Sequence, residues 1–303
     1  MKHLLKMMDL STEEIIEILN LADQLKYELK HGIPHDHLKG KTLGMIFRKA
    51  STRTRVSFET GMYQLGGNPL YLSASDMQIG RGEPIQDTAR VLSRYIDGIM
   101  IRTFDQAEVE NLAEYGNIPI INGLTDLSHP CQVLADLMTI REYKGKLDGL
   151  KMCYIGDGNN MANSLIVGGL KTGMSVSVAC PENYHPAATT LAFAKKYDCF
   201  ELTDDPIKAA KDADVIFTDV WASMGEEDKA AERIALLRPY QVNKEMLEMT
   251  GKDTTVVMHC LPAVKGHEIT EDVFEHYADV IFDEAENRMH TIKAVMVATL
   301  GEY

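Results

Sequence analysis

The chain has 303 residues, 45% of them hydrophobic and 25% charged, which is the composition of a globular protein long enough for two domains with a core each. Its net charge of -14 argues against a nucleic-acid partner or an anionic membrane surface, because both require a basic face. Five scattered cysteines without a C-x-x-C pair, no signal-peptide pattern and no apolar run long enough to span a bilayer predict a cytoplasmic protein with reduced thiols.

The predicted elements alternate between short apolar strands and amphipathic helices. The first is a helix that starts after Ser11, which forms a capping-box pattern with Glu14. Strands are predicted at residues 42–47, 69–72, 98–101, 118–121, 151–155, 175–180, 214–218, 255–259 and 279–283. Because helical patterns lie between most of these strands, the chain is predicted to form two doubly wound α/β domains with mostly parallel sheets.

A long amphipathic helix that begins near Pro130 and ends near Gly145 marks the predicted domain boundary, because a new strand starts soon after it. The first predicted domain is residues 1–130, joined by a C-terminal helix at 288–303 that returns to it. The second predicted domain is residues 131–287.

The stretch KASTRTRVSFE (49–59) places arginines at the start of a predicted helix, where acidic residues are normally favoured. The first backbone N–H groups of a helix have no internal acceptor and bind anions, and the hydroxyls of Ser51, Thr52 and Thr54 add donors there. The planar guanidinium of Arg53 matches the oxygens of a phosphate. The stretch therefore predicts a phosphate site. The alternative is a solvent-exposed arginine beside an ordinary Ser or Thr cap.

Polar side chains follow several predicted strands, at the sheet edge where open α/β folds bind their ligands. They are Arg102, His129, Gln132, Asn159, Asn160, Asp219, His259, Cys260, Glu286 and Arg288. Together they predict an active site in the cleft between the two domains. Each one alone has an ordinary structural explanation: a histidine before proline is a common turn residue, an aspartate caps helices, and a cysteine after a strand is often a small buried hydrophobe.

Four motifs resemble, in order and spacing, the aspartate/ornithine carbamoyltransferase family. They are STRTR (51–55), HPCQ (129–132), DVWASMG (219–225) and HCLP (259–262), and the segment 80–104 is similar to the family's sequence between the first two. The last two motifs favour the ornithine members. Aspartate members carry HPLP in place of HCLP, and putrescine members carry a tyrosine-containing loop in place of WASMG.

The resemblance implies transfer of a carbamoyl group from carbamoyl phosphate to the δ-amine of L-ornithine, giving L-citrulline and phosphate, with no metal or organic cofactor. The catalytic residues that it implies are Arg53, Arg102, His129, Gln132, Asp219, Cys260 and Arg288. In this scheme residues 51–54 and Arg102 hold the phosphate. Arg102, His129 and Thr54 hold the developing oxyanion.

The resemblance also implies the remaining substrate contacts. Gln132, the backbone carbonyl of Leu261 and Arg288 would bind the carbamoyl NH₂ group. The implied ornithine-binding residues are Asn160, Asp219, Ser223, Met224 and Cys260. Gln78 would reach the phosphate site of a neighbouring subunit, which requires a homo-oligomer built on trimers. The loop around Ser223 is expected to close over ornithine and exclude water from a hydrolysable substrate.

The amine chemistry implies a pH dependence. A lysine-like amine has a pKa of about 10.4, so its reactive neutral form costs roughly 4–5 kcal/mol at pH 7. Pairing with a carboxylate would add to this cost, because an opposite charge favours the ammonium form. We therefore expect the complex to take up or generate the neutral amine, with activity that rises into the alkaline range.

Three alternatives compete with this interpretation. A nicotinamide-dependent dehydrogenase is suggested by Gly156 and Gly158 after a predicted strand, but Met161 stands where the third glycine of the fingerprint belongs. A non-catalytic member of the same family is the second, although such a protein has no physical need for the full set of motif residues. The third keeps the chemistry and changes the acceptor to putrescine, lysine or an acylated ornithine.

Overall fold

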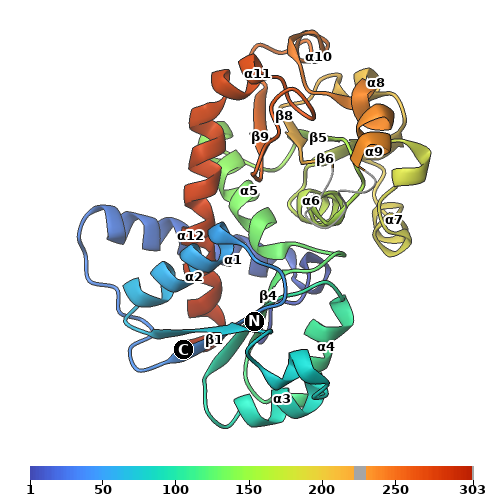
Figure 1. The fold of residues 1–303 in the computed structure, drawn as a ribbon. Coiled ribbons are helices and arrows are strands. Elements are labelled where there is room, and N and C mark those ends of the chain that lie inside the picture. The colour runs from blue at the N-terminus through green and yellow to red at the C-terminus, as the bar shows by residue number, and fades with distance from the viewer. Residues whose placement is uncertain (222–229, 302–303) are drawn as a thin grey trace. The chain divides into compact units, whose positions relative to one another are not determined.

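The computed structural model describes residues 1–221 and 230–301, which belong to two compact units (Figure 1). Unit 1 consists of Met1–Ala135 and Asn287–Tyr303, and unit 2 consists of Asp136–Glu286. Each unit has its own parallel sheet with helices around it. Within the described ranges, no helix combines the length and the apolar character needed to cross a membrane.

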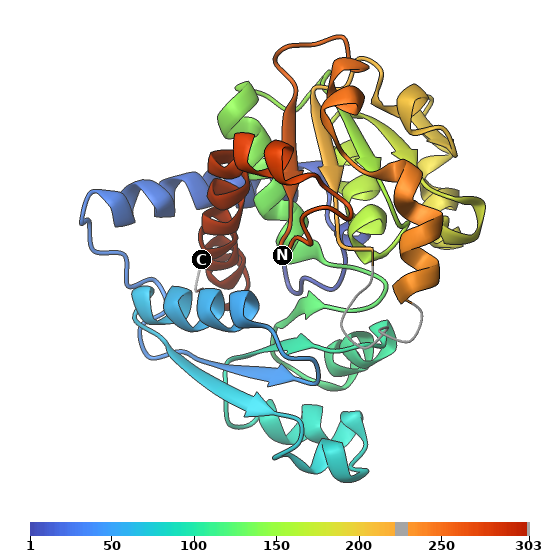
Figure 2. The ribbon, with the colours of Figure 1, turned by 45° about the horizontal axis from the view of Figure 1, so that its top comes forward.

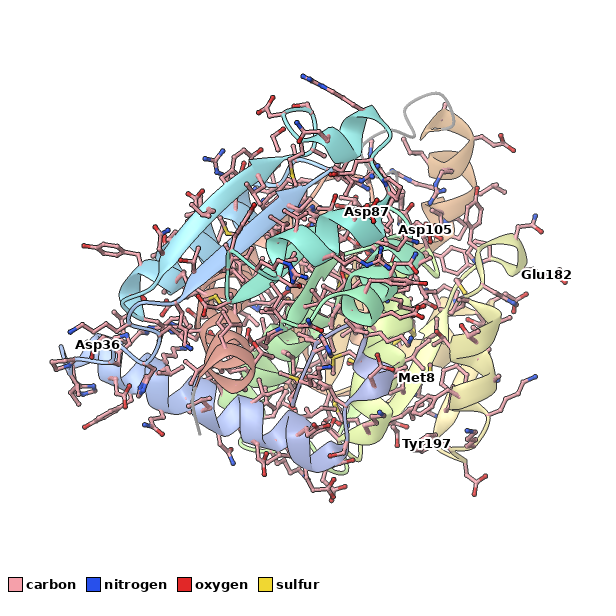
Figure 3. The ribbon with its side chains drawn as sticks, turned by 90° about the horizontal axis from the view of Figure 1, so that it is seen from below. Met8, Asp36, Asp87, Asp105, Glu182 and Tyr197 are labelled. Atoms are coloured by element: carbon pink, nitrogen blue, oxygen red, sulfur yellow. The ribbon has the colours of Figure 1, made fainter. Side chains whose placement is uncertain are left out.

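Unit 1 is built on a four-stranded parallel sheet in the order β2-β1-β3-β4. Its strands are β1 (Thr42–Phe47), β2 (Asn68–Ser73), β3 (Gly98–Arg102) and β4 (Ile120–Leu124). Its helices are η1 (Met7–Asp9), α1 (Thr12–Lys30), α2 (Thr52–Gln64), η2 (Gln78–Arg81), α3 (Ile85–Leu92) and α4 (Gln106–Tyr115). Figure 2 shows α2 along one face of the sheet and α3 beyond the other. Figure 3 shows α3 and α4 packed side by side, with Asp87 labelled in α3 and Asp105 labelled just before α4.

Unit 2 is built on a five-stranded parallel sheet in the order β7-β6-β5-β8-β9 (Figure 1). Its strands are β5 (Lys151–Ile155), β6 (Ser175–Ala179), β7 (Phe200–Thr203), β8 (Val215–Thr218) and β9 (Val256–His259). Its helices are α6 (Asn160–Lys171), η3 (Glu182–Tyr184), α7 (Ala188–Ala194), α8 (Pro206–Ala210), α9 (Ala230–Leu237), η5 (Arg238–Tyr240), α10 (Lys244–Glu248) and α11 (Glu271–His276). The order of both sheets reverses direction next to the first strand, as in doubly wound folds. The predicted fold class is confirmed.

Hydrophobic residues of the central strands form the two cores. In unit 1, Ile46, Ile99 and Ile101 pack with residues of α4 such as Val109. The core of unit 2 gathers Cys153, Ile155, Ile216, Val257 and Trp221 with residues of the surrounding helices, among others. The central strands are buried on both faces, so they read as continuous apolar runs, which is typical of parallel sheets. This burial is why the sequence identified these strands so clearly.

Local sequence explains where helices begin. The Oγ of Ser11 accepts the N–H of Glu14 at 3.1 Å, and the Glu14 side chain accepts the N–H of Ser11 at 2.9 Å. This reciprocal arrangement confirms the predicted capping box. Asp105 caps α4 by accepting the N–H of Ala107 at 2.9 Å. Each cap satisfies a donor that has no acceptor inside its own helix.

Two long helices contribute residues to both units, and one of them corrects a prediction. They are α5 (Pro130–Lys144), whose predicted start at Pro130 is confirmed, and α12 (Ala278–Leu300). The predicted strand at 279–283 is wrong, because these residues form the first turns of α12. A short apolar run fits a buried helix as well as a strand, and residues 278–300 contain neither glycine nor proline to interrupt the helix. Arg288 therefore lies within a helix rather than after a strand.

Two smaller differences concern strand limits. The strand predicted at 118–121 lies at Ile120–Leu124, because Pro119 offers no N–H to the ladder. The edge strand β7 is absent from the predicted strands. Its four residues are all half-buried and include Glu201 and Thr203, so they do not form an apolar run.

Candidate active site

The first turn of α2 in unit 1 has the features of a helix start that suits an anion. Ser51 has an extended backbone, with φ -161° and ψ 117°, and its Oγ accepts the N–H of Thr54 at 3.2 Å. Thr52 and Arg53 open the helix, and its first turn contains no acidic side chain. The partial positive charge of this helix end is therefore not balanced from within its first turn.

The hydroxyl of Thr54 joins side chains from different parts of unit 1. Thr54 is fully buried, and its Oγ1 accepts from Ser51 Oγ at 3.1 Å, from Arg288 Nη2 at 3.0 Å and from Arg102 Nη1 at 3.4 Å. Arg102 ends β3, and Arg288 comes from α12. A hydroxyl oxygen has only two lone pairs, so it cannot accept strongly from all three donors. Two buried guanidinium groups beside a helix N-terminus create a strongly positive site that suits an anion.

His129 is held neutral by its surroundings. Burial lowers the pKa of the imidazole well below its usual value, and the charges of Arg288, Arg102 and Arg53 lower that pKa further. At neutral pH the ring is therefore uncharged, with one N–H to donate and one nitrogen that accepts. A neutral imidazole can donate a hydrogen bond to a carbonyl oxygen and stabilise the charge that develops on it.

The residues that follow His129 begin α5. Gln132 is 1% exposed, so its amide can act only toward the interior or toward a bound molecule. Next to it, the Cys131 thiol donates to the backbone carbonyl of Asn122 at 3.3 Å. Burial raises the pKa of Cys131 to about 12, so this thiol stays protonated and acts as a packing residue. The residues predicted to hold the phosphate and the carbamoyl group thus all belong to unit 1. They are Arg53, Thr54, Arg102, His129, Gln132 and Arg288.

In unit 2, Asp219 follows β8 and accepts from three donors. Its Oδ1 accepts the Cys260 thiol at 3.0 Å and the N–H of Val220 at 2.8 Å. Its Oδ2 accepts from Asn159 Nδ2 at 2.8 Å. These contacts fix both carboxylate oxygens in place and leave a negative group at the carboxyl end of the sheet. Such a group suits a cationic amine.

The thiol of Cys260 is protonated at neutral pH. Burial raises its pKa well above the usual value, and the neighbouring Asp219 raises it further, with smaller contributions from Glu284 and Asp136. A nucleophilic cysteine needs the opposite environment, one that stabilises the thiolate. Cys260 therefore acts here as a neutral hydrogen-bond donor.

The start of α6 brings a residue to this site that the sequence did not assign to ornithine. Asn159 caps the helix, since its Oδ1 accepts the N–H groups of Met161 at 2.9 Å and Ala162 at 3.3 Å. The same side chain donates to Asp219, whereas the expected residue, Asn160, is the first residue of the helix. An asparagine directly after a strand and before a helical pattern is the signal that would have identified Asn159 as this cap.

The loop after β9 is fixed by a buried histidine and a buried glutamate. The sequence places His259 at the predicted site without giving it a role, and it does not point to Glu268. His259 Nε2 lies 3.1 Å from Glu268 Oε1, and both side chains are fully buried. The N–H of Leu261 donates to His259 Nδ1 at 2.9 Å, so the other ring nitrogen carries the proton toward Glu268. Leu261 itself has φ +57° and precedes a cis peptide bond to Pro262. The sequence could not reveal this pairing, because Glu268 lies nine residues away in an irregular segment.

Within the described residues, one group of side chains has the donor set of a metal site. Asp219, His259 and Cys260 each offer one ligand atom, and these atoms lie within 4.8 Å of one another. Oxygen, nitrogen and sulfur donors together suit a borderline cation such as zinc. An ion there would have to displace the proton that Cys260 donates to Asp219.

The remaining predicted residues have the following positions. Gln78 begins the short helix η2 after β2 and is exposed. Ser223 and Met224, with the loop that was expected to close, lie outside the described residues. Gly158 has a packing role that needs no dinucleotide, since a Cβ there would lie 2.3 Å from the carbonyl oxygen of Tyr184. The dehydrogenase alternative thereby loses one of its two glycines.

Comparison with known proteins matches almost the whole chain. Residues 2–142 match the family described as "Aspartate/ornithine carbamoyltransferase, carbamoyl-P binding domain", and residues 148–299 match "Aspartate/ornithine carbamoyltransferase, Asp/Orn binding domain". The chain is 53% identical to the ornithine carbamoyltransferase of Thermococcus kodakarensis, over 99% of this chain and 96% of that protein. It is 54% identical to the ornithine carbamoyltransferase of Carboxydothermus hydrogenoformans, over 98% and 97% of the two chains.

A solved structure has the same fold. The ornithine carbamoyltransferase from Pyrococcus furiosus superposes with a TM-score of 0.95 at 52% identity, covering 100% of this chain and 98% of the other. At this level of identity and coverage, the likeness extends beyond fold to family.

Proposed function

The chain belongs to the aspartate/ornithine carbamoyltransferase family, and from this premise we infer that it transfers the carbamoyl group of carbamoyl phosphate to the δ-amine of L-ornithine, giving L-citrulline and phosphate. Relatives of high identity over the full length carry the name ornithine carbamoyltransferase, so putrescine is not the favoured acceptor. The observation that carries the inference is the cluster of Thr54, Arg102, Arg288 and neutral His129 at the start of α2.

Unit 1 supplies the groups that a carbamoyl phosphate dianion requires. The N–H groups and hydroxyls at residues 51–54 and the guanidinium groups of Arg53 and Arg102 suit the phosphate oxygens. The neutral ring of His129 would donate to the carbamoyl oxygen while Gln132 and Arg288 contact the rest of the carbamoyl group. Removing one such donor typically costs about 3–4 kcal/mol of transition-state stabilisation.

Unit 2 supplies the groups that suit ornithine. Asp219 and Cys260 would lie beside the δ-amine, with Asn160, Ser223 and Met224 holding the rest of the amino acid and Leu261 offering its carbonyl to the carbamoyl NH₂. The lone pair of the neutral amine attacks the carbamoyl carbon, and the carbonyl electrons move onto oxygen. The oxyanion then collapses, the bond from carbon to the phosphate oxygen breaks, and the proton lost by the nitrogen is balanced by the proton that the released phosphate takes up. Cys260 stays a thiol throughout, because its pKa is raised.

We propose that the enzyme is a homotrimer or a multiple of trimers in which Gln78 reaches the phosphate site of a neighbouring subunit. The edge strand β2 exposes Leu70 and Tyr71, and helix α2 next to it exposes Val56 and Tyr63, the last with 78% of its surface exposed. Apolar side chains on an exposed sheet edge favour burial against another subunit. Light scattering of the purified protein would test this, and a monomeric mass with full activity would contradict it.

We propose a cytoplasmic location and the biosynthetic direction. All five cysteines are free thiols, which favours a reducing compartment. One relative at 53% identity, from Pyrococcus furiosus, is named an anabolic ornithine carbamoyltransferase. Steady-state rates measured in both directions would test the second proposal.

A direct assay tests the proposed function. Purified protein is incubated with carbamoyl phosphate and one acceptor at a time: L-ornithine, putrescine, L-lysine or N-acetyl-ornithine. The carbamoylated product is measured together with released phosphate, so that hydrolysis is not mistaken for transfer. We expect L-ornithine to give the highest kcat/KM. A higher kcat/KM with another acceptor would correct the substrate, and phosphate release without any carbamoylated product would refute transfer.

A further inference from the structure

A cluster of buried polar side chains lies in unit 1 directly before His129 in the chain. Its members are Gln106, Asn122, Thr125 and Ser128, and none is more than 9% exposed. The mechanism above gives none of them a role. Burying four polar side chains costs free energy unless their hydrogen bonds are made, so the pattern of those bonds is informative.

Gln106 is the common acceptor of this cluster. Its Oε1 accepts from Thr125 Oγ1 at 2.8 Å, from Ser128 Oγ at 3.2 Å and from Asn122 Nδ2 at 3.4 Å. Its Nε2 donates to the backbone carbonyl of Leu5 at 3.3 Å, so both ends of the amide are in use. The oxygen has two lone pairs, which the hydroxyls of Thr125 and Ser128 use at the two shorter distances. Asn122 Nδ2 is held more closely by the carbonyl of Leu5 at 2.7 Å and by Ser128 Oγ at 3.1 Å.

The bonds to Thr125 and Ser128 fix the turn that leads into His129. The N–H of Thr125 donates to the carbonyl of Ser128 at 2.9 Å, and the N–H of Ser128 donates to Thr125 Oγ1 at 3.1 Å. The Thr125 hydroxyl thus accepts from the turn while it donates to Gln106. The carbonyl of His129 then accepts the N–H of Val133 at 3.3 Å as α5 begins. The backbone on both sides of His129 is held.

Gln106 also ties this turn to the loop that follows Arg102. It is the first residue of α4, directly after the cap residue Asp105, which Figure 3 labels. The loops after β3 and β4 are joined by two backbone bonds, Thr103 N–H to Leu124 at 3.0 Å and Asp126 N–H to Phe104 at 2.9 Å. The Gln106 amide adds a side-chain link between the same two loops, one of which follows Arg102 while the other precedes His129.

We propose that Gln106 is a positioning residue for carbamoyl transfer, which aims the neutral imidazole of His129 at the carbamoyl oxygen by fixing the turn of Thr125–Ser128; this inference rests on the proposed function. The imidazole has a single N–H, so its direction decides how well it stabilises the oxyanion. A displacement of about 1 Å at such a group can cost about 100-fold in rate. The phosphate, in contrast, is held by the start of α2 and by arginines outside the cluster.

The experiment compares two substitutions that break the cluster with one that restores it. Gln106→Leu removes the common acceptor, Thr125→Val removes the bridging hydroxyl, and Thr125→Ser keeps that hydroxyl. Ser177→Ala in unit 2 is the matched control, because Ser177 is buried and donates to the carbonyl of Ala209 at 2.8 Å. Each protein is measured for Tm, for its Kd for inorganic phosphate by calorimetry, and for kcat and KM.

We expect Gln106→Leu and Thr125→Val each to lower kcat by about 10- to 100-fold while the Kd for phosphate stays within about threefold. Thr125→Ser should keep most of the original kcat. The double variant that combines Gln106→Leu with Thr125→Val should have a kcat only slightly lower than either single variant, because both changes remove the same hydrogen bond. Ser177→Ala should lower Tm to a similar extent without lowering kcat.

Two outcomes would overturn the proposal. In the first, folded Gln106→Leu or Thr125→Val retains kcat. In the second, kcat and phosphate affinity fall together in proportion to Tm, which is what a merely structural role predicts. If Gln106→Leu does not fold, Thr125→Val with its Thr125→Ser partner decides the matter. If the unaltered protein forms no citrulline at all, the proposed function is refuted instead. A failure of the Gln106 proposal can therefore be distinguished from a failure of the proposed function.

Discussion

The two units of this protein build binding groups of opposite charge by the same means. In unit 1, burial and three arginines lower the pKa of His129. In unit 2, burial and nearby carboxylates, of which Asp219 contributes most, raise the pKa of Cys260. The shifts have opposite signs but the same result, since each group is neutral at pH 7 and can donate a hydrogen bond. Charge is supplied by fixed neighbours, and the titratable groups proposed to act on the substrates are kept uncharged.

This difference reflects the substrates proposed for each unit. A phosphate dianion needs cations, and a neutral imidazole can then polarise the carbamoyl oxygen without carrying a charge of its own. An amine needs a carboxylate for recognition, but it must be neutral to react. The neutral thiol beside Asp219 occupies one of the carboxylate oxygens that would otherwise stabilise the ammonium form.

The largest expected effect comes from removing charge in unit 1. Arg53 is half-buried in the free protein, and a bound phosphate would bury it further. Arg53→Gln should lower kcat/KM for carbamoyl phosphate by about 1000-fold, because truncating one partner of a charge pair that binding buries costs about 2–5 kcal/mol. The affinity for inorganic phosphate should fall with it, and the pKa of His129 should rise toward its usual value, since Arg53 contributes to its depression. Kinetics and calorimetry measure the first two, and NMR of the imidazole measures the third.

Arg90→Gln is the matched control for this change. Arg90 is an exposed arginine in α3 that pairs with Asp87 at 3.0 Å, and exposed pairs contribute little. Both substitutions remove one positive charge from unit 1, so only a local role of Arg53 predicts different outcomes. Unchanged turnover and phosphate affinity in Arg53→Gln would refute the anion site at the start of α2.

A pH profile tests the requirement for a neutral amine. If the complex uses the neutral amine, kcat/KM for ornithine should rise by about tenfold per pH unit above pH 6, because a lysine-like amine titrates near 10.4. His129 should not produce an alkaline rise of its own, since its pKa is lowered and it is already neutral at pH 6.5 and above. A flat profile between pH 6 and 9 would contradict this account.

The same contrast explains which parts of the molecule could be predicted from the sequence. Strands such as β3 and β5 are apolar on both faces, so their runs in the sequence identify them, and the residues at their carboxyl ends follow by topology. The strand prediction at 279–283 was wrong because a short apolar run occurs both in buried strands and in the first turns of a buried helix such as α12. Only tertiary packing distinguishes the strand from the helix there. Motifs predict the charged residues of the proposed site but not the groups that hold them.

Those supporting groups lie outside every motif or far away in the chain. Gln106 meets Ser128 across 22 residues, and His259 meets Glu268 across an irregular segment. Nothing in the identity of a glutamine at position 106 predicts that three donors converge on it, because this depends on how the loops after β3 and β4 are joined. Even the charge state of His129 follows from burial and from three arginines that are distant in sequence.

In unit 2 a moderate effect is expected from Asp219→Asn. This change removes the negative charge that suits the amine, and we expect kcat/KM for ornithine to fall by roughly 30- to 100-fold while KM for carbamoyl phosphate changes little. It should also lower the pKa of Cys260, because Asp219 contributes to raising it. Peptide-resolved alkylation at pH 8 should then be several times faster at Cys260, with the exposed thiol of Cys199 as internal reference. Equal alkylation rates of Cys260 with and without the substitution would contradict the claim that the charge of Asp219 raises the pKa of Cys260.

The smallest effect is on stability, and its sign should be opposite for the two units. The pKa of His129 is lower in the folded protein than its ordinary 6.5, so the unfolded chain binds more protons and stability is lost as pH falls below about 6.5. The pKa of Cys260 is higher than its ordinary 9.0, so the folded protein binds more protons and stability is lost as pH rises above about 9. For either group, the free energy of unfolding changes by at most about 1.4 kcal/mol per pH unit.

Urea unfolding at pH 5, 7 and 10, at one protein concentration, measures this free energy for the unaltered protein and for two variants. Relative to the unaltered protein, His129→Gln should become more stable only at pH 5, and Cys260→Ser should become more stable only at pH 10. If both substitutions changed stability equally at all three pH values, the opposite neutralisation of the two groups would be wrong, and packing alone would explain their burial.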